Sequence, residues 1–537
     1  MAVRPGAAGA DGASPAPPSP SAAAKAPSPA GPASPLADPA SPLEETVESR
    51  GIEPVPDHER RGRVRELFPT WVAANISVLL LTMGAGLVVF NGLNFWQVLI
   101  AAAVAGTLSF GLVGLLSVSG KWGGAPGAML SRATFGVRGN YFPGMILWVA
   151  RFGWETINAV TGAYAVLTVL RLLFGIQRST PLVVVTLLLF VGVTFVVSGM
   201  GRKVLNLCNT WSTYLFGLFT VLVLVYLVGT IDWGEVFSRP AGGTAMLIAG
   251  IGTIAAGGIS WIPTGPDFAR YLPHSAQGRK IFGTTVSGAL LVLVPMVLMG
   301  GVMSAKNPAL AKTNDPVSFL GEALPGWLSV PYLLIALIGM VLINSLSMYS
   351  AGFTAQTMGV KLPRASAVSI NAVISLVGGL LLMLVAKSFY GQFISFLSLL
   401  AVSFSAWVGV YGVDMQRRRR MTVRYDPAGL MDTSRTSRYW YVGGFCWQAM
   451  TAWGVALVLG LGFTRCEWFA GPFVDTWIGE RGLGWAATVL VAAVLFAVLP
   501  APREQPAGQL RPGARGQEPA GAEGRPADGA AVPGRTS

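Results

Sequence analysis

Charged residues are scarce in this sequence, and one long stretch is almost without acidic ones. Only 12% of the 537 residues are Asp, Glu, Lys or Arg, whereas soluble proteins carry about 25%. Glu155 is the only acidic residue between Glu66 and Asp232. A chain this poor in charge, with 52% hydrophobic residues and a mean hydropathy of +0.57, is expected to lie in a membrane.

Residues that commonly build catalytic or metal sites are also rare. The three cysteines, Cys208, Cys446 and Cys466, have neither metal-like spacing nor the pattern of a disulfide framework. No Gly-rich phosphate loop ending in Lys-Ser/Thr is present, which argues against an ATP-driven pump. No cluster of His, Cys and carboxylate residues with catalytic spacing lies among the apolar segments. We therefore expect no enzyme, no metal and no other cofactor.

The two ends of the chain lack long apolar runs. Eleven of the first 43 residues are proline, and the other end is rich in Gly, Ala and Pro. Such segments cannot bury enough apolar surface to fold. We therefore predict a disordered cytoplasmic arm at 1–66, a membrane domain at 67–503 and a disordered cytoplasmic tail at 504–537, with residues 1–60 dispensable. The N-terminus also lacks the basic-then-apolar pattern of a signal peptide.

Twelve apolar runs of roughly 20 residues recur between these ends, each long enough to span about 30 Å of hydrocarbon as a helix. Helices are expected because a single strand cannot satisfy its backbone in lipid. The fold class we predict is an all-α polytopic membrane protein. Its twelve spans lie at approximately 70–92, 97–119, 141–170, 180–199, 206–230, 246–271, 283–304, 327–356, 366–386, 391–413, 439–463 and 483–501.

The basic residues, which give a net charge of +13, gather in every second loop rather than in one patch. By the positive-inside rule this pattern places both termini in the cytoplasm of a multi-pass cell-membrane protein. The charge is therefore read as topology, and no nucleic-acid partner is expected. The run Arg417 to Arg420 is interpreted as a topology anchor beside anionic lipid.

Two of the predicted spans carry residues that interrupt helices. The first contains "LTMGAGLV" (81–88), and the sixth contains three glycines and two prolines within 257–266. Interruptions at corresponding positions are typical of secondary transporters built from two inverted repeats, here five helices each. Close helix packing through small residues is the alternative for the first span.

An aromatic and an amide side chain share one face of the third span. Trp154 and Asn158 are four residues apart, so both point to the same side of a helix. Trp261 lies in the sixth span, and Asn344 lies in the eighth, which is equivalent to the third under the repeat. Trp stacks on planar rings, and Asn offers a donor and an acceptor to their edges. The four residues suit a planar heteroaromatic ligand, with helix packing as the alternative for any one of them.

Three stretches resemble the nucleobase–cation symporter family in its purine–cytosine permease branch. They are "LSRATFGVRGNYFPGMILWVARFGWETINAVTGAYA" (130–165), "SWIPTGPDFARYLP" (260–273) and "VDMQRRRRMTVRYDPAGL" (413–430). The resemblance covers about 66–503. It implies ten core helices in two inverted five-helix repeats, plus two peripheral helices, working by alternating access.

The resemblance also implies roles for single residues. Trp154 and Trp261 fall at aromatics that stack on substrate, and Asn158 falls at the amide position of the purine–cytosine branch. In the eighth span the sequence departs from the family's Asn/Pro-rich pattern at Leu346, which leaves the exact nucleobase open. The predicted substrate-binding set is Trp154, Asn158, Trp261, Asn344, Ser347 and Gly84.

Glu155 is a candidate for coupling transport to protons. A charged carboxylate costs about 2.5–3.5 kcal/mol in an apolar span. In sodium-coupled relatives, hydroxyl side chains lie one to two turns before the eighth-span Asn, where this chain has Ile338, Gly339 and Met340. Thr82 remains as a hydroxyl for a cation, so sodium is disfavoured rather than excluded. A structural hydrogen bond to a neighbouring helix is the other interpretation of Glu155.

Asp267 and Arg270, three residues apart at the end of the sixth span, are interpreted as a gating or structural ion pair. Together the observations predict a monomeric symporter in the lipid bilayer that imports a nucleobase, cytosine or a purine, with a proton. Allantoin, hydantoin or a related small heterocycle, with sodium as the coupling ion, is the alternative. From other classes, a membrane sensor would bind ligand without accumulating it, and a channel would conduct without coupling.

Overall fold

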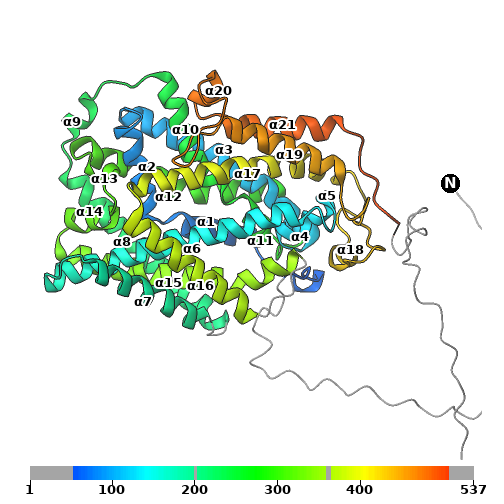
Figure 1. Cartoon of the computed structure of the whole chain (residues 1–537), viewed down its shortest axis with the longest axis horizontal. Coiled ribbons are helices and arrows are strands. Elements are labelled where there is room, and N and C mark those ends of the chain that lie inside the picture. Colours follow the sequence, from blue (N-terminus) through cyan, green and yellow to red (C-terminus); the bar gives the residue numbers. More distant parts are fainter. Residues whose placement is uncertain (1–51, 199–201, 359–363, 507–537) are drawn as a thin grey trace, which may run out of the picture. The chain divides into compact units, whose positions relative to one another are not determined.

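The computed structural model describes residues 52–198, 202–358 and 364–506, and the regular elements of these residues are helices, as predicted (Figure 1). The first half comprises α1 Leu67–Asn75, α2 Val78–Val89, α3 Phe95–Gly123, α4 Gly127–Leu130, α5 Arg132–Phe135, α6 Tyr141–Phe174, α7 Thr180–Ser198, α8 Arg202–Thr230, α9 Trp233–Ser238, α10 Thr244–Ile259 and α11 Gly265–Ala269. The second comprises α12 Gly278–Lys306, α13 Ala309–Lys312, α14 Pro316–Ala323, α15 Gly326–Thr357, α16 Arg364–Leu380, α17 Phe389–Arg418, α18 Pro427–Met431, α19 Trp447–Gly462, α20 Trp477–Glu480 and α21 Gly484–Val498. Short turns of tighter or wider helix lie at Asp57–Glu59, Val64–Glu66, Ile262–Thr264 and Leu381–Val385.

Every predicted apolar run coincides with a helix or a pair of helices. Within the described residues, nine helices are long and apolar enough to cross a membrane. The bent pair Val64–Asn75 and Val78–Val89, which includes α1 and α2, raises the number of candidate spans to ten if it is counted as one span. The last two predicted runs form the shorter apolar helices α19 and α21. The eleventh run begins later than predicted, because residues 442–446 form a turn with Gly443 and Gly444 at positive φ. The count of twelve crossings and the inverted repeat stay predictions.

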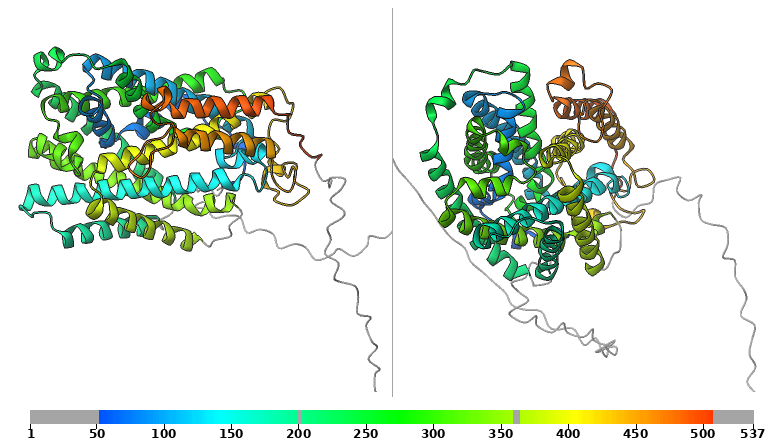
Figure 2. Two further views of the ribbon diagram at one scale, coloured as in Figure 1. Left: turned by 45° about the horizontal axis from the view of Figure 1, so that its top comes forward. Right: turned by 60° about the vertical axis from the view of Figure 1, so that its left-hand side comes forward.

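The long helices pack in two groups. One contains α2, α3, α10 and α12, with α1 and α11 against it, and the other contains α6, α7, α8, α15 and α16. Figure 2 shows α6 running alongside α7, α15 and α16. Helix α17 contacts α10 on one side and the α19–α21 pair on the other (Figure 1). The candidate residues of α6 therefore lie in the second group, near α17.

The predicted interruption of the first span at 81–88 is wrong in position. Helix α2 runs unbroken through these residues, and the bend of 64° falls between α1 and α2, at residues 76–77. The Ser77 hydroxyl accepts a hydrogen bond from the Leu79 N–H at 3.2 Å and so caps the start of α2. A Cβ at Gly84 would collide with the backbone carbonyl of Val297 in α12. This glycine therefore serves close packing of two helices, the alternative interpretation of the motif.

The predicted interruption of the sixth span is confirmed. Helix α10 ends at Ile259, a turn of tighter helix follows at Ile262–Thr264, and α11 then covers Gly265–Ala269. Pro263 and Pro266 have no N–H to continue an α-helical ladder. The chain thus leaves regular α-helix in the segment that holds Trp261.

The predicted arm at 1–66 extends too far along the chain, because residues 52–66 pack against the membrane domain. Val55 is buried and donates its N–H to the Gly124 carbonyl at 2.8 Å. Arg60 is also buried, and its guanidinium donates to the carbonyls of Val55 and Lys121 at 2.9 and 3.0 Å. These contacts, together with the hydrogen bond from the Gly62 N–H to the Tyr271 carbonyl at 3.0 Å, hold a segment that is rich in charged residues, unlike the Pro/Ala/Ser-rich arm before it. Residues 1–51 lie outside the described part.

Two truncations should separate the arm from this anchored segment. A chain starting at Ile52 is expected to unfold at the same temperature as the full-length protein. A chain starting at Arg61 loses Val55 and Arg60, whose removal takes these donors from the Lys121 and Gly124 carbonyls at the end of α3 and should cost about 1–3 kcal/mol. Thermal unfolding in detergent measures the difference. Equal unfolding temperatures for both truncations would restore the original boundary.

Candidate functional site

Helix α6 presents neighbouring residues to different partners. It ends at Phe174, and the next residue, Gly175, adopts the left-handed conformation (φ 68°) that favours glycine after a helix. The ring of Trp154 faces α17, where it meets Phe396 and Phe393 edge-to-face at centroid distances of 5.8 and 6.3 Å. Glu155 faces α15 and α16 instead. This separation follows from the rotation of about 100° per residue in a helix.

Asn158 and Asn344, which the repeat hypothesis directs toward one central cavity, are hydrogen-bonded to each other. The side-chain amide nitrogen of Asn158 donates to the side-chain oxygen of Asn344 at 3.1 Å. Asn344 in turn donates to the backbone carbonyl of Glu155 at 3.0 Å. Asn344 is fully buried, whereas Asn158 is half-buried. The pair joins α6 to α15 and leaves Asn158 as the more accessible amide.

The carboxylate of Glu155 is held by donors from two other helices. Its side chain is completely buried. Ser347 of α15 donates to Oε1 at 2.5 Å, and the Asn371 amide of α16 donates to Oε1 at 3.0 Å and to Oε2 at 2.8 Å. Buried charges need such partners, because an unpaired one is costly in an apolar medium. The predicted hydrogen bond to neighbouring helices is therefore present, and Ser347 contacts Glu155.

Sequence reasoning did not select Asn371. The signal was available, since it is a single amide within the mostly apolar helix Arg364–Leu380. Only the packing of α16 against α6 brings it opposite Glu155. The site thus contains one more polar residue than the predicted set.

The sixth-span aromatic lies among other partners. Trp261 follows the end of α10, and its ring meets Trp71 of α1 edge-to-face at 6.1 Å. Trp71 is fully buried and also contacts Phe110 and Phe268. The structure therefore brings the polar candidates together and gives the two candidate tryptophans, Trp154 and Trp261, separate aromatic neighbours.

The two candidate residues of α2 have different surroundings. Thr82 is buried, and its hydroxyl has no hydrogen-bond partner within the described residues. Gly84, two residues on, packs against the α12 backbone at Val297. Thr82 thus keeps a free oxygen, and Gly84 has a packing contact that accounts for its lack of a side chain.

The acid and base at the end of the sixth span make local contacts. Asp267 accepts a hydrogen bond from the Gly127 N–H at 2.8 Å, which ties α11 to the start of α4. Arg270 donates to the Tyr271 hydroxyl at 2.6 Å and lies over the Tyr271 ring. The Asp267 contact connects two segments at this end of the helices, whereas the Arg270 contacts stay with the neighbouring residue. A role in gating stays a prediction.

The interpretation of Arg417 to Arg420 as a lipid anchor is wrong for Arg418. This side chain is buried and pairs with Asp414 and Glu504, each at 2.6 Å. It also donates to the Ala133 carbonyl at 2.6 Å. Glu504 pairs in addition with Arg438 at 2.6 Å. We call these four charged residues, Asp414, Arg418, Arg438 and Glu504, the α17 end cluster; it extends the ordered domain past the predicted boundary at 503.

A buried phenol supports the α17 end cluster from the loop before α19. Tyr441 donates to the Ala133 carbonyl at 2.6 Å, the same carbonyl that accepts from Arg418. Burial raises the pKa of the Tyr441 hydroxyl well above its usual range, so it stays protonated and remains a donor. The cluster therefore joins α5, the end of α17, the loop before α19 and the chain after α21.

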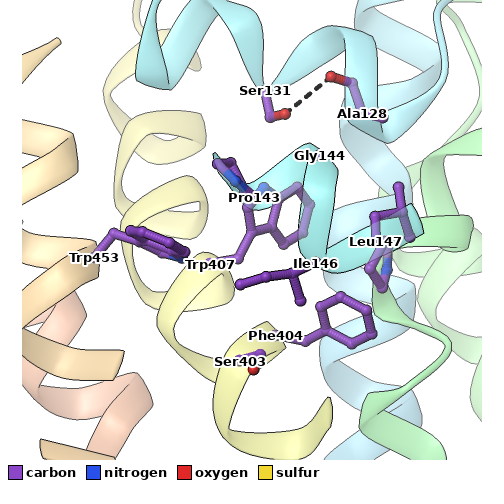
Figure 3. A pocket seen from close by; sticks show the side chains of 11 residues that line it. Ala128, Ser131, Pro143, Gly144, Ile146, Leu147, Ser403, Phe404, Trp407 and Trp453 are labelled. Atoms are coloured by element: carbon purple, nitrogen blue, oxygen red, sulfur yellow. Dashed lines mark hydrogen bonds between the residues drawn. The ribbon is translucent and has the colours of Figure 1, made fainter. Parts of the chain in front are cut away.

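An apolar cavity lies between the first half of α6 and the second half of α17 (Figure 3). Ile146 and Leu147 of α6 line it, together with Phe404 and Trp407 of α17 and Trp453 of α19. Ile146 precedes Trp154 by eight residues, which corresponds to about 12 Å along a helix. The cavity is lined by none of the predicted site residues and is separate from the polar group around Glu155. Among the described residues, no three His, Cys, Asp or Glu side chains are placed to hold a metal ion.

The bent and interrupted helices and the buried polar group between α6, α15 and α16 define a polytopic membrane protein of the transporter type. Residues 54–481, more than half of the chain, match the family model described as permease for cytosine/purines, uracil, thiamine, allantoin. The chain belongs to this family, and it is a permease rather than an enzyme.

Individual relatives agree with this family. The chain is 26% identical to the putative purine-cytosine permease YxlA of Bacillus subtilis, over 85% of this chain and 96% of that one. It is 26% identical to a hydantoin permease of Microbacterium maritypicum, over 73% of this chain and 80% of that one.

Solved structures show the same fold. The structure of Mhp1, a nucleobase-cation-symport-1 family transporter, in a closed conformation with bromovinylhydantoin bound, is similar with a TM-score of 0.63 and 20% identity, over 83% of this chain and 93% of that chain. The inward-facing conformation of Mhp1 is similar with a TM-score of 0.64 and 19% identity, over 84% and 94% of the two chains.

Proposed function

We propose that this permease imports a nucleobase, cytosine or a purine, by alternating access. The hydrogen bond between Asn158 and Asn344 carries the proposal, because it sets a half-buried amide between two packed helices. A nucleobase edge carries neighbouring donors and acceptors, and an amide matches both. Trp154, one turn before Asn158 on the same face, supplies a flat ring for stacking.

Uptake of radiolabelled cytosine, adenine, hypoxanthine, uracil and allantoin by transport-deficient cells tests the proposal. Saturable accumulation of cytosine or a purine above the external concentration supports it. Binding without accumulation would identify a sensor instead, and flux without accumulation would identify a channel. Either result would overturn the proposal.

Allantoin or a hydantoin is the second candidate substrate. Its support is the similarity to the hydantoin permease, which extends over 73% of this chain. Small cyclic ureides also present alternating N–H and C=O groups, so the Asn158 amide fits them as well. Competition decides between the candidates: excess unlabelled allantoin or hydantoin should leave cytosine uptake unchanged if nucleobases are the substrates.

We also propose that a proton is the coupling ion and that Glu155 carries it. The buried carboxylate lies between three helices, and its backbone carbonyl binds the Asn344 that holds Asn158. A change of charge at Glu155 therefore acts next to the candidate substrate ligands. The eighth-span positions Ile338, Gly339 and Met340 offer sodium no side-chain oxygen, which disfavours sodium coupling.

Glu155→Gln is expected to bind substrate but lose accumulation. Glutamine keeps an oxygen to accept from Asn371 and offers an N–H toward Ser347, whose hydroxyl can accept, so the variant should fold. It can no longer release a proton. Binding to purified protein and uptake into cells measure the two properties, with a protonophore and sodium-free buffer applied to the wild type. Undiminished accumulation by the variant would remove Glu155 from coupling, and sodium dependence of the wild type would exclude proton symport.

For the arrangement in the cell we propose a monomer in the cell membrane with both termini cytoplasmic. Light scattering of the purified protein tests the monomer. Labelling of single cysteines introduced at the two ends, from either side of the membrane, tests the orientation.

A further inference from the structure

Asn371 and Glu155 form a side-chain pair in which one partner has an unused acceptor. The Asn371 amide nitrogen lies 2.8 and 3.0 Å from the two carboxylate oxygens. Its side-chain oxygen is buried and has no hydrogen-bond partner in the described part of the chain. Buried amide oxygens without partners are uncommon, and leaving one costs about 1–3 kcal/mol. Both carboxylate oxygens of Glu155 therefore accept hydrogen bonds, whereas the side-chain oxygen of Asn371 accepts none within the described residues.

The protonation state of Glu155 decides how well this amide fits it. An ionised carboxylate only accepts hydrogen bonds, so both of its oxygens can accept from the N–H₂ group of Asn371, as the two distances indicate. A protonated carboxyl turns one of these oxygens into an O–H donor and keeps the other as an acceptor, so the N–H₂ group in this orientation loses one of its two contacts. The observed orientation of the amide therefore favours the ionised carboxylate.

The other contacts of Glu155 connect this pair to the candidate substrate site. Ser347 of α15 donates to Oε1, and Asn344 of the same helix holds both the Glu155 backbone carbonyl and Asn158. Asn371 supplies the link to α16. The carboxylate is therefore the point at which α6, α15 and α16 share hydrogen bonds, one helical turn from Asn158.

Few other charges act on this carboxylate. Arg151, one turn earlier on α6, is the charged side chain that faces Glu155. Helix α7 has no titratable residue, and the described side chains of α16 add none. Tyr332, the titratable side chain described on α15, lies about four turns from Ser347. Neutral donors, rather than counter-charges, surround most of the group.

We propose that Asn371 is a positioning residue of a proton-binding site at Glu155: its amide stabilises the ionised carboxylate and so sets the pH at which the proton is bound and released. This proposal rests on the proposed proton coupling. It gives α16, which contains none of the predicted substrate-binding residues, a function in proton binding.

Infrared difference spectroscopy of the purified, lipid-embedded protein tests the assignment without any substrate. A carboxylic C=O band that appears on acidification and is absent from Glu155→Gln reports protonation of Glu155. Asn371→Leu removes the donor to both oxygens, so the midpoint of this band should move to higher pH by about one unit, a tenfold gain in proton affinity. Asn371→Asp, nearly the same shape, places a second carboxyl beside the first and should also move it upward. The pH dependence of uptake should follow the band in both variants.

Ser375→Ala is the matched control, since Ser375 is buried one turn further along the same helix and makes no hydrogen bond to Glu155. Its midpoint should equal that of the wild type. An unchanged midpoint in both Asn371 variants would overturn the proposal, as would a wild-type spectrum without a band that Glu155→Gln removes. A band that shifts as expected in a protein that accumulates no nucleobase would instead support the proton site and contradict the proposed substrate.

Discussion

Asn158→Ala is expected to abolish nucleobase uptake while the protein still reaches the membrane. The half-buried amide of Asn158 is the accessible member of the Asn158–Asn344 pair. An alanine side chain has neither a donor nor an acceptor for the polar edge of the bound ligand. A polar edge left without its partner costs about 1–3 kcal/mol, roughly a ten- to hundredfold loss of affinity. Asn344→Ala should have at least the same effect, because it also releases the backbone carbonyl of Glu155. Uptake kinetics and binding to purified protein measure both losses.

Thr161→Ala is the matched control for these variants. Thr161 is a buried polar residue on the same helix, and its hydroxyl bonds to the Ile157 carbonyl within α6. Its uptake constants should stay close to those of the wild type. If the two asparagine variants also transport with near-normal constants, the amide pair is a helix–helix contact and the substrate binds elsewhere.

Apolar runs were sufficient to predict the helices, because a membrane segment is marked by length and composition alone. Places where a helix bends proved less predictable. In the sixth span, prolines remove N–H groups, and the interruption is where they are. In the first span, the glycine at position 84 is compatible with a bend in the helix and equally with close packing against another helix. Only the position of the Val297 backbone in α12 shows that close packing is the reason.

The polar site was predictable where residues shared one helix, and much less so where they did not. The four-residue spacing placed Trp154 and Asn158 on one face, and the repeat hypothesis added Asn344. Asn371 and Glu504, a partner of Arg418, come from segments far away in sequence, and no local pattern pairs either of them with its buried partner. Tertiary packing converts an isolated Asn, or one Arg in a run of four, into a buried ligand of a carboxylate.

Arg418→Met is expected to destabilise the protein by about 3–5 kcal/mol, the range for breaking a buried ion pair by removing one partner. Methionine fills much of the arginine volume but leaves Asp414 and Glu504 without their shared cation. The side chains of Arg418 and Asp414 are only 3% and 5% exposed, so water cannot replace the lost contacts. Arg438 still pairs with Glu504, whereas Asp414 keeps, among the described residues, the hydrogen bond from the Thr134 hydroxyl. Thermal unfolding in detergent, followed by the fraction of monodisperse protein, measures the loss.

Arg420→Met, two residues along the same run of arginines, is the matched control because its side chain is exposed at the end of α17. It should unfold close to the wild-type temperature, since exposed charges contribute about 0–1 kcal/mol. Neutralising the acids as well, with Asp414→Asn and Glu504→Gln added to Arg418→Met, should recover most of the stability. The unpaired buried charges would then be gone, and replacing a whole buried ion pair is often neutral. If Arg418→Met and Arg420→Met unfold together, the α17 end cluster contributes nothing to stability, and the run Arg417 to Arg420 acts through its charge alone, as the sequence interpretation holds.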